Sequence, residues 1–201
     1  MDADAAELRV LGCLIEKQRT TPDVYPLSLN ALRLACNQST NRDPVVDYDE
    51  QTIRAALERL SRKAWVRLAS GPGSRAVKYR HLFDEALGLE PAETALLCVL
   101  MLRGPQTPGE LKQRTERLHR FDSAADLDRT LEALIGRELA AQLPRRPGQK
   151  EQRYAHLLGG EAEGAEQLEP AAESSLEARV ARLEHELAEL RETVESLPRP
   201  L

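Results

Sequence analysis

The sequence contains few aromatic residues: two Phe, one Trp and four Tyr make up 3% of its 201 residues. A hydrophobic core must therefore be assembled from Leu, Val, Ile and Ala. Leu and Ala favour helices, whereas β-sandwich strands are typically rich in aromatic and β-branched residues. The composition thus favours a mainly α-helical fold, and the length suffices for one large domain or two small ones that each bury a core.

Long hydrophobic segments and cysteine frameworks are also missing. The longest apolar run, residues 95–102, has eight residues, whereas roughly 20 are needed to span a bilayer. The N-terminus is acidic and lacks the apolar core of a signal peptide. Cys13, Cys36 and Cys98 lie in apolar runs without CxxC or Cys/His spacing, so we expect buried free thiols in a reducing compartment. These features predict a soluble cytoplasmic protein.

Enzyme motifs are absent from the sequence. It has no GxSxG, P-loop or HExxH motif and no Cys/His arrangement typical of a nucleophile. The Gly-rich residues 71–75 join two strand-like runs, so they lack the helix N-terminus that a phosphate cradle uses. His81 and His156 are too isolated to bind a metal, and each follows the Tyr of a predicted hairpin, which indicates a structural role. We expect no enzyme activity, cofactor or metal.

The net charge of −5 argues against nucleic-acid binding only if the charges are evenly distributed, and they are not. Residues 159–197 contain eleven Glu and three Arg, whereas residues 1–158 contain 24 basic and 22 acidic side chains. An acidic appendage on a more basic body is one pattern of nucleic-acid-binding proteins, although acidic tails also serve solubility alone.

The most informative stretch is residues 49–82. Its first part predicts a helix, because apolar residues recur at helical spacing: Ile53, Ala56, Leu57, Leu60 and Ala64. After Trp65, which we expect in the core, the pattern changes to two short alternating runs around residues 71–74, typical of a hairpin with a Gly/Pro tip. Residues 51–82 contain eight Arg or Lys residues but a single acidic residue, Glu58. A basic helix followed by a basic hairpin predicts a winged helix-turn-helix.

An internal repeat strengthens this interpretation. Ala6-Glu7, Leu11 and Leu14 correspond to Ala92-Glu93, Leu97 and Leu100 at an offset of 86 residues, and Leu57-Glu58 corresponds to Leu131-Glu132 at an offset of 74. Two copies of one helix–helix–helix–hairpin unit are therefore predicted. We expect helix N-caps at Ser28, at Asp47 or Asp49, at Thr107 and at Ser123. The predicted domains are residues 1–86 and 87–158.

The C-terminal part predicts a flexible acidic linker, residues 159–175, and a coiled-coil helix, residues 176–197. Val180, Leu187 and Val194 occupy heptad a positions, and Leu183 and Leu190 occupy d positions. Val at a with Leu at d favours a parallel dimer, although a single amphipathic helix that packs on its own chain is the alternative. The dimer predicts a larger sedimenting mass for the intact chain than for one ending near Gly160, and unchanged mass would refute it.

Several runs resemble one bacterial family. Glu16-Lys-Gln-x-Thr-Thr-Pro-Asp23, Tyr25-Pro-Leu-Ser-Leu-Asn-Ala-Leu and Ala35-Cys-Asn-Gln-Ser-Thr-Asn-Arg-Asp-Pro-Val45 are similar to the YceH family, whose proteins are built from tandem winged-helix domains. The resemblance covers roughly residues 5–158. It implies a mainly α fold with small β wings, namely two tandem winged helix-turn-helix domains followed by a C-terminal helix, but it implies no established activity.

The leading functional hypothesis is binding of double-stranded DNA by the first domain. The third helix of such a fold typically enters the major groove, where Gln51, Arg54 and Ala55 would contact bases. Phosphate contacts are predicted for Arg59, Arg62, Lys63, Arg75 and Lys78, and the second hairpin offers Arg145, Arg146 and Lys150. The alternative is that these side chains form only the solvated face of an ordinary helix.

Two further alternatives remain open. In residues 37–43, Asn41 and Arg42 could contact a nucleic-acid backbone, or Asn37 and Asp43 could close helix ends and turns. The third helix of the second copy carries Asp128 and Glu132 beside Arg129 on its outer side, which suits protein–protein contacts better than DNA. A scaffold or interaction module built on tandem winged helices is therefore the rival function.

Overall fold

The fold is mainly α-helical with two small antiparallel sheets, as predicted. The computed structural model describes residues 2–69, 77–145 and 151–159. The first half contains α1 (Ala5–Thr20), the 3-10 helix η1 (Pro22–Val24), β1 (Leu27–Ser28), α2 (Leu29–Cys36), α3 (Glu50–Arg62), β2 (Val66–Leu68) and β3 (Lys78–His81). After the short α4 (Phe83–Leu87), the second half contains α5 (Pro91–Arg103), α6 (Pro108–Thr115), α7 (Ala124–Gly136), β4 (Ala140–Leu143) and β5 (Arg153–His156).

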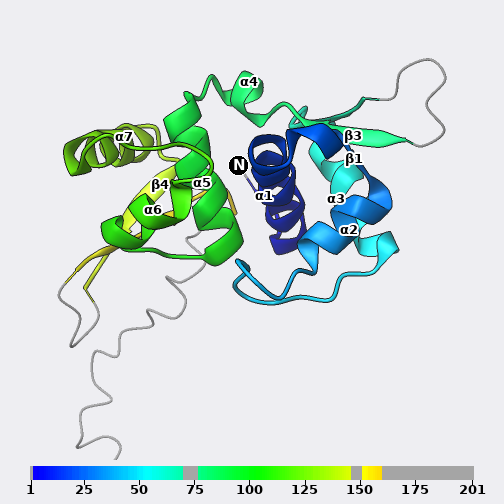
Figure 1. The fold of residues 1–201 in the computed structure, drawn as a ribbon, viewed down its shortest axis with the longest axis horizontal. Coiled ribbons are helices and arrows are strands. Elements are labelled where there is room, and N and C mark those ends of the chain that lie inside the picture. Colours follow the sequence, from blue (N-terminus) through cyan, green and yellow to red (C-terminus); the bar gives the residue numbers. More distant parts are fainter. Residues whose placement is uncertain (1, 70–76, 146–150, 160–201) are drawn as a thin grey trace, which may run out of the picture. The chain divides into compact units, whose positions relative to one another are not determined.

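Both halves follow the same element order and close their hairpins in the same way. In the first half the strand order is β1-β3-β2, with Val66 opposite His81. In the second half β4 pairs with β5, and Gln106 forms an isolated bridge to Tyr154 where β1 pairs with β3 in the first half. Figure 1 shows the strands of the first half beside α2 and α3 and those of the second half beside α6 and α7.

The helix starts confirm the capping residues read from the sequence. Ser28 accepts a hydrogen bond from the amide of Ala31, and Asp49, rather than Asp47, caps α3 through the amide of Thr52. Thr107 and Ser123 form capping boxes with the residue three positions on. Such caps satisfy amides that the helix itself leaves unpaired, and each contributes about 1 kcal/mol.

The backbone after each third helix also repeats. Ala64 and Glu138 both adopt a left-handed conformation, with φ of 58° and 56°. The next residue then donates back into the helix, from Trp65 N to Leu60 O (3.0 Å) and from Leu139 N to Leu134 O (2.9 Å). The residues correspond at the offset of 74 seen in the sequence. The two hairpins therefore leave their helices along equivalent paths.

Helix α1 is the centre of the hydrophobic core and packs against α2, α3 and α5. One cluster of buried residues extends through both halves without interruption. The two helices α1 and α5 approach each other closely at Gly12, where an added Cβ would lie 2.9 Å from the Cγ of Leu102 on α5. Because that distance is shorter than real Cβ contacts, α1 and α5 need glycine here to pack this closely.

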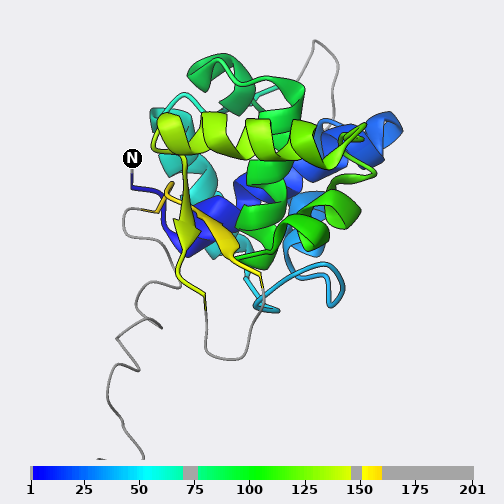
Figure 2. The same ribbon diagram turned by 90° about the vertical axis from the view of Figure 1, so that its left-hand side faces the viewer.

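The three cysteines and Trp65 are buried as expected, whereas Ala64, predicted for the apolar stripe of the third helix, is exposed, because α3 already ends at Arg62. Cys13, Cys36 and Cys98 are buried free thiols. Burial raises the pKa of Cys98, and the hydrogen bond with Cys13 together with burial raises that of Cys36. Trp65 is buried against Phe83 with the two rings nearly perpendicular. In the second half, α7 crosses in front of α5 in Figure 2, with β4 and β5 beneath it.

Some predictions concern residues that the structure does not describe. The linker at residues 159–175 lies outside the described residues except for Gly159, which forms a bridge to Asp2. The whole of residues 176–197 lies outside them, and with it the dimer-helix positions Val180, Leu183, Leu187, Leu190 and Val194. Among the helices that are described, none is long and apolar enough to cross a membrane.

Candidate nucleic-acid interface

One face of α3 is exposed along its length. Gln51, Arg54, Glu58 and Arg62 are exposed and Ala55 is half-buried, while Ile53, Ala56, Leu57 and Leu60 are buried on the opposite side. The predicted base-contacting residues therefore share one accessible stripe. Arg54 forms an ion pair with Glu50 (2.7 Å), one turn back in the exposed first turn. Such an exposed pair is weak, so Arg54 can exchange it for another partner.

The β2–β3 hairpin continues this surface. Arg67 is exposed on β2 and lies directly opposite Arg80 in the antiparallel register. Like charges in opposed positions destabilise a strand pair, and Glu85 neutralises only the Arg80 side at 2.5 Å. Lys78 is half-buried on β3, and Arg75 lies outside the described residues. The hairpin thus carries cationic charge that an external anion would stabilise.

Arg59 and Lys63 lie on the flank of α3 that faces the start of α1. The guanidinium of Arg59 lies 2.6 Å from the Asp4 carboxylate and 3.5 Å from that of Glu7. The Lys63 ammonium donates to Glu7 at 2.6 Å and to the carbonyl oxygen of Asp2 at 2.6 Å. Both cations, predicted as phosphate contacts, are therefore already paired with acidic groups of the same chain.

The second half repeats the Lys63 contact. Glu93 and Arg137 stand at the positions equivalent to Glu7 and Lys63, and Arg137 donates to both Glu93 carboxylate oxygens at 3.2 Å. Arg137 also donates to the carbonyl oxygen of Gly88, just after α4. Because the ion pair recurs between the first helix and the end of the third, we interpret Lys63 as a residue that fixes α3 on α1.

Residues 37–49, which connect α2 to α3, are held by polar contacts. Asn37 caps α2 and exchanges two hydrogen bonds of 2.9 Å with the backbone of Tyr48. Arg42 is buried and donates to Glu16, Gln38 and the Ala35 carbonyl. Burial excludes the suggested contact between Arg42 and a nucleic-acid backbone, and the helix-closing role of Asn37 is confirmed.

Two buried arginines explain how this long connection is supported. Arg9, in the apolar run of α1, donates to the carbonyl oxygens of Cys36 (3.3 Å) and Pro44 (2.6 Å). Arg42 reaches Glu16 on the same helix. Sequence reasoning missed both residues as structural groups. The available signal for Arg9 was a charged residue on the apolar face of a helix, where a buried charge requires partners.

The two predicted structural histidines are both buried. His81 Nε2 lies 2.6 Å from the Gln18 side-chain oxygen, and Asp84 approaches Nδ1 at 3.4 Å. Burial lowers the pKa of each imidazole to about 4, and for His81 the carboxylate of Asp84 opposes part of that shift. Both side chains are therefore neutral at pH 7.

The outer face of α7 differs from that of α3. Asp128, Arg129 and Glu132 are exposed, and Ile135 is 37% exposed. Arg129 pairs with Asp126 within the same helix. Of the second-hairpin cations, Arg145 is exposed, whereas Arg146 and Lys150 lie outside the described residues. This face is less suited to a phosphate backbone than the first.

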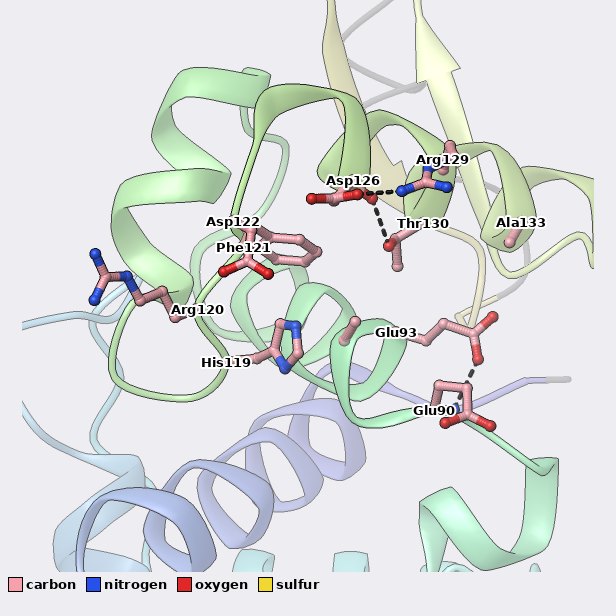
Figure 3. Close-up of a pocket in the computed structure, with 11 residues that line it drawn as sticks. Glu90, Glu93, His119, Arg120, Phe121, Asp122, Asp126, Arg129, Thr130 and Ala133 are labelled. Atoms are coloured by element: carbon pink, nitrogen blue, oxygen red, sulfur yellow. Dashed lines mark hydrogen bonds and ion pairs between the residues drawn. The ribbon is translucent and has the colours of Figure 1, made fainter.

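A cleft opens beside α7, between the start of α5 and the connection from α6. Its volume is about 450 Å³, and it is lined by Glu90, Ala92, Glu93, His119, Arg120, Phe121, Asp122, Asp126, Arg129, Thr130 and Ala133 (Figure 3). The rings of His119 and Phe121 contact each other edge to face, with centroids 4.9 Å apart.

Nowhere in the described residues do three or more His, Cys, Asp or Glu side chains group as metal ligands.

The chain is similar to a set of bacterial proteins whose names record no activity. The family model "Protein of unknown function, DUF480" matches residues 3–149. A UPF0502 protein of Shewanella sp. (strain MR-4) is 45% identical over 220 residues that cover 98% of each chain. One from Solibacter usitatus is 50% identical over 199 residues, covering 98% of this chain and 96% of its own. UPF0502 protein YceH of Escherichia fergusonii is 46% identical over 204 residues, 96% and 94% of the two chains.

Proposed function

The chain belongs to the DUF480 family, which includes YceH, and from this premise we propose that it binds double-stranded DNA through α3 and the β2–β3 hairpin of its first half. The observation that carries the proposal is the accessible stripe of α3, followed directly by a cationic hairpin. Three helices followed by a two-stranded wing form a winged helix-turn-helix, in which the third helix enters the major groove.

The ion pairs change which residues we expect to contact DNA. Gln51, Arg54 and Ala55 remain the base-contacting residues, because they are accessible near the start of α3. Arg62 and Arg67 have no ion-pair partner among the described residues and become the main phosphate contacts, with Lys78 as a further candidate; Arg75 stays a prediction from the sequence. Arg59 and Lys63 take a structural role. Their pairing with Asp4 and Glu7 holds α3 at a fixed angle to α1.

Replacing Arg62 and Arg67 together by alanine is expected to weaken binding to duplex DNA and to reduce its salt dependence. Each lost phosphate contact removes about 0.9 from the slope of log K against log salt concentration, so the double variant should lose roughly 1.8. Fluorescence anisotropy of the full chain with a mixed-sequence duplex, from low to physiological salt, measures both quantities.

The matched control is Lys112→Ala/Arg117→Ala, which removes two exposed cations from the α6 region of the second half. Its salt slope should equal that of the unaltered chain. A chain that fails to bind mixed duplex even at low salt would sink the DNA proposal, and equal slopes in both double variants would place the contact elsewhere.

One observation favours a second function, a protein–protein interaction module. The exposed face of α3 also carries Glu50 and Glu58, and the equivalent face of α7 carries Asp128, Glu132 and the partly exposed Ile135. Faces of mixed charge with an apolar residue suit protein partners better than phosphate. The same anisotropy titration separates the two functions, because a scaffold that does not contact DNA leaves the duplex free at every salt concentration.

For both functions we propose a cytoplasmic homodimer formed through residues 176–197, on the heptad pattern of that segment. Two equivalent first halves would then match the two half-sites of a palindromic duplex.

A further inference from the structure

In the first half the side chain of Arg59 binds two carboxylates at the start of α1, and the second half has no arginine at the equivalent position. The two halves can be aligned residue by residue at this place. The amide after α3, at Lys63, bonds the carbonyls of Arg59 and Ser61, and the amide after α7, at Arg137, bonds those of Ala133 and Ile135. Arg59 and Ala133 are therefore structural equivalents.

The carboxylates that bind Arg59 have equivalents as well. Asp4 is the N-cap of α1 and Glu7 is its third residue, and Glu90 and Glu93 hold the same two positions on α5. In both helices the side chain of the third residue accepts a hydrogen bond from the N-cap amide, at 2.9 Å from Asp4 and 2.8 Å from Glu90. The geometry that places two acidic side chains beside the third helix is thus present twice.

The second half has no cation at the position of Arg59, although both carboxylate positions are acidic in each half, with Glu90 where the first half has Asp4. In the first half the Arg59 guanidinium lies 2.6 Å from Asp4 and 3.5 Å from Glu7. In the second half position 133 is alanine, whose methyl group cannot reach Glu90 or Glu93. The contact of Lys63 with Glu7 is retained by Arg137 and Glu93, so the change is confined to the position of Arg59.

The space left by the missing side chain belongs to the cleft of about 450 Å³ beside α7. Figure 3 shows Glu90, Glu93 and Ala133 on one side of this cleft and His119, Phe121 and Asp122 on the other. Its two arginines form exposed ion pairs with neighbouring carboxylates, Arg129 with Asp126 and Arg120 with Glu116. Glu90 and Asp122 have no ion-pair partner among the described residues, so the cleft carries uncompensated negative charge beside aromatic rings.

We propose that this cleft binds a guanidinium group supplied from outside the chain, in the place that Arg59 occupies in the first half. The two carboxylates accept its N–H groups, as Asp4 and Glu7 do for Arg59. The group comes either from a small molecule such as agmatine or from an arginine side chain of a peptide. The site is independent of DNA binding, because it lies in the second half.

The test titrates the full chain with three probes: agmatine, a blocked Gly-Arg-Gly peptide, and the same peptide with citrulline in place of arginine. Citrulline keeps the shape of the side chain but carries no charge. Amide chemical shifts or calorimetry should show saturable binding of a guanidinium probe with Kd on the order of 1 mM or tighter, and at least tenfold weaker binding of the citrulline peptide.

The decisive variant is Ala133→Arg, which restores the internal arginine of the first half. It should fill the cleft, weaken guanidinium binding at least tenfold and raise the melting temperature. Ala125→Arg adds the same charge to an exposed position of α7 outside the cleft and should leave binding unchanged within about twofold. Glu90→Gln, which removes one carboxylate of the site without adding bulk, should also weaken binding and covers the case in which Ala133→Arg does not fold.

The probes distinguish the two sources. Tighter binding of the arginine peptide than of agmatine would identify a protein side chain as the partner, and the reverse would identify a small guanidinium compound. No saturable binding of either guanidinium probe at ten times the expected Kd would overturn the proposal. So would equal binding of the arginine and citrulline peptides, or unchanged binding in both Ala133→Arg and Glu90→Gln.

Discussion

Replacing Arg42 by methionine is expected to lower the free energy of unfolding by about 3–5 kcal/mol, the usual cost of removing one partner of a buried ion pair. The Arg42 side chain is fully buried and donates to both Glu16 carboxylate oxygens, at 3.1 and 2.6 Å. Burial raises the pKa of Glu16, but the hydrogen bond and charge of Arg42 outweigh it and hold that pKa below its ordinary value. Without the guanidinium, the carboxylate of Glu16 remains charged although it is largely shielded from solvent. Its remaining ion-pair partner is then Lys17, at 3.4 Å.

Urea unfolding of the full chain, followed by circular dichroism, measures this loss. Arg54→Met is the matched control, because it breaks an arginine–glutamate pair whose side chains are 54% and 60% exposed. That variant should lose less than about 0.5 kcal/mol. If both methionine variants unfolded at the same urea concentration, Arg42 would have no special role in stability.

The same replacement should also disturb the start of α3. Arg42 donates to the carbonyls of Ala35 and Asn41, and Arg9 donates to those of Cys36 and Pro44. Arg9 thus ties the connection to α1, and Arg42 ties it to α2 and, through Glu16, also to α1. Since that connection sets where Asp49 caps α3, loss of Arg42 should shift the amide resonances of residues 37–49 and weaken any DNA contact made by Gln51 and Arg54.

The features that could be predicted from the sequence are local or repeated. An N-cap such as Ser123 is recognised by the residue three positions on, and both partners lie within one turn. The apolar stripe of α3 could be predicted from helical periodicity alone: Ile53, Ala56, Leu57 and Leu60 are buried, and the prediction is wrong only for Ala64, which lies beyond the end of the helix. The repeat supplied a second copy of the same pattern. The correspondence between the two copies extends to the backbone, because Ala64 and the equivalent Glu138 both adopt a left-handed conformation.

The ion pairs of Arg59 with Asp4 and of Lys63 with Glu7 could not be predicted from such local patterns. A helical wheel shows which side of α3 is apolar, but it does not show which flank a neighbouring helix covers. That information is tertiary, because Asp4 and Glu7 come from the far end of the sequence of the first half. One signal was present: position 7 and its equivalent 93 are both Glu, while position 63 and its equivalent 137 are both basic. A charge pair preserved across a duplication indicates a contact.

Lowering the pH from 7 to 5 is expected to reduce the free energy of unfolding by roughly 4 kcal/mol, about 2 from each of His81 and His156. Both have a folded-state pKa of about 4, below the ordinary value of 6.5, because burial disfavours the charged imidazole. Between these values the unfolded chain binds more protons than the folded chain. The contribution is therefore complete above pH 6.5, falls as the pH decreases, and is lost once the pH passes below about 4.

Urea midpoints measured at intervals between pH 7 and pH 5 test this expectation, because carboxylates with lowered pKa such as Glu16 and Asp126 are protonated only at more acidic pH. His156→Gln should remove about half of the pH dependence, since the imidazole of His156 shifts through burial alone. His119→Gln is the matched control: this histidine is only partly buried in the connection between α6 and α7, and the full dependence should persist. A dependence that survived replacement of both His81 and His156 would assign the titration to other groups, and the neutral, buried state of the two repeated histidines would be wrong.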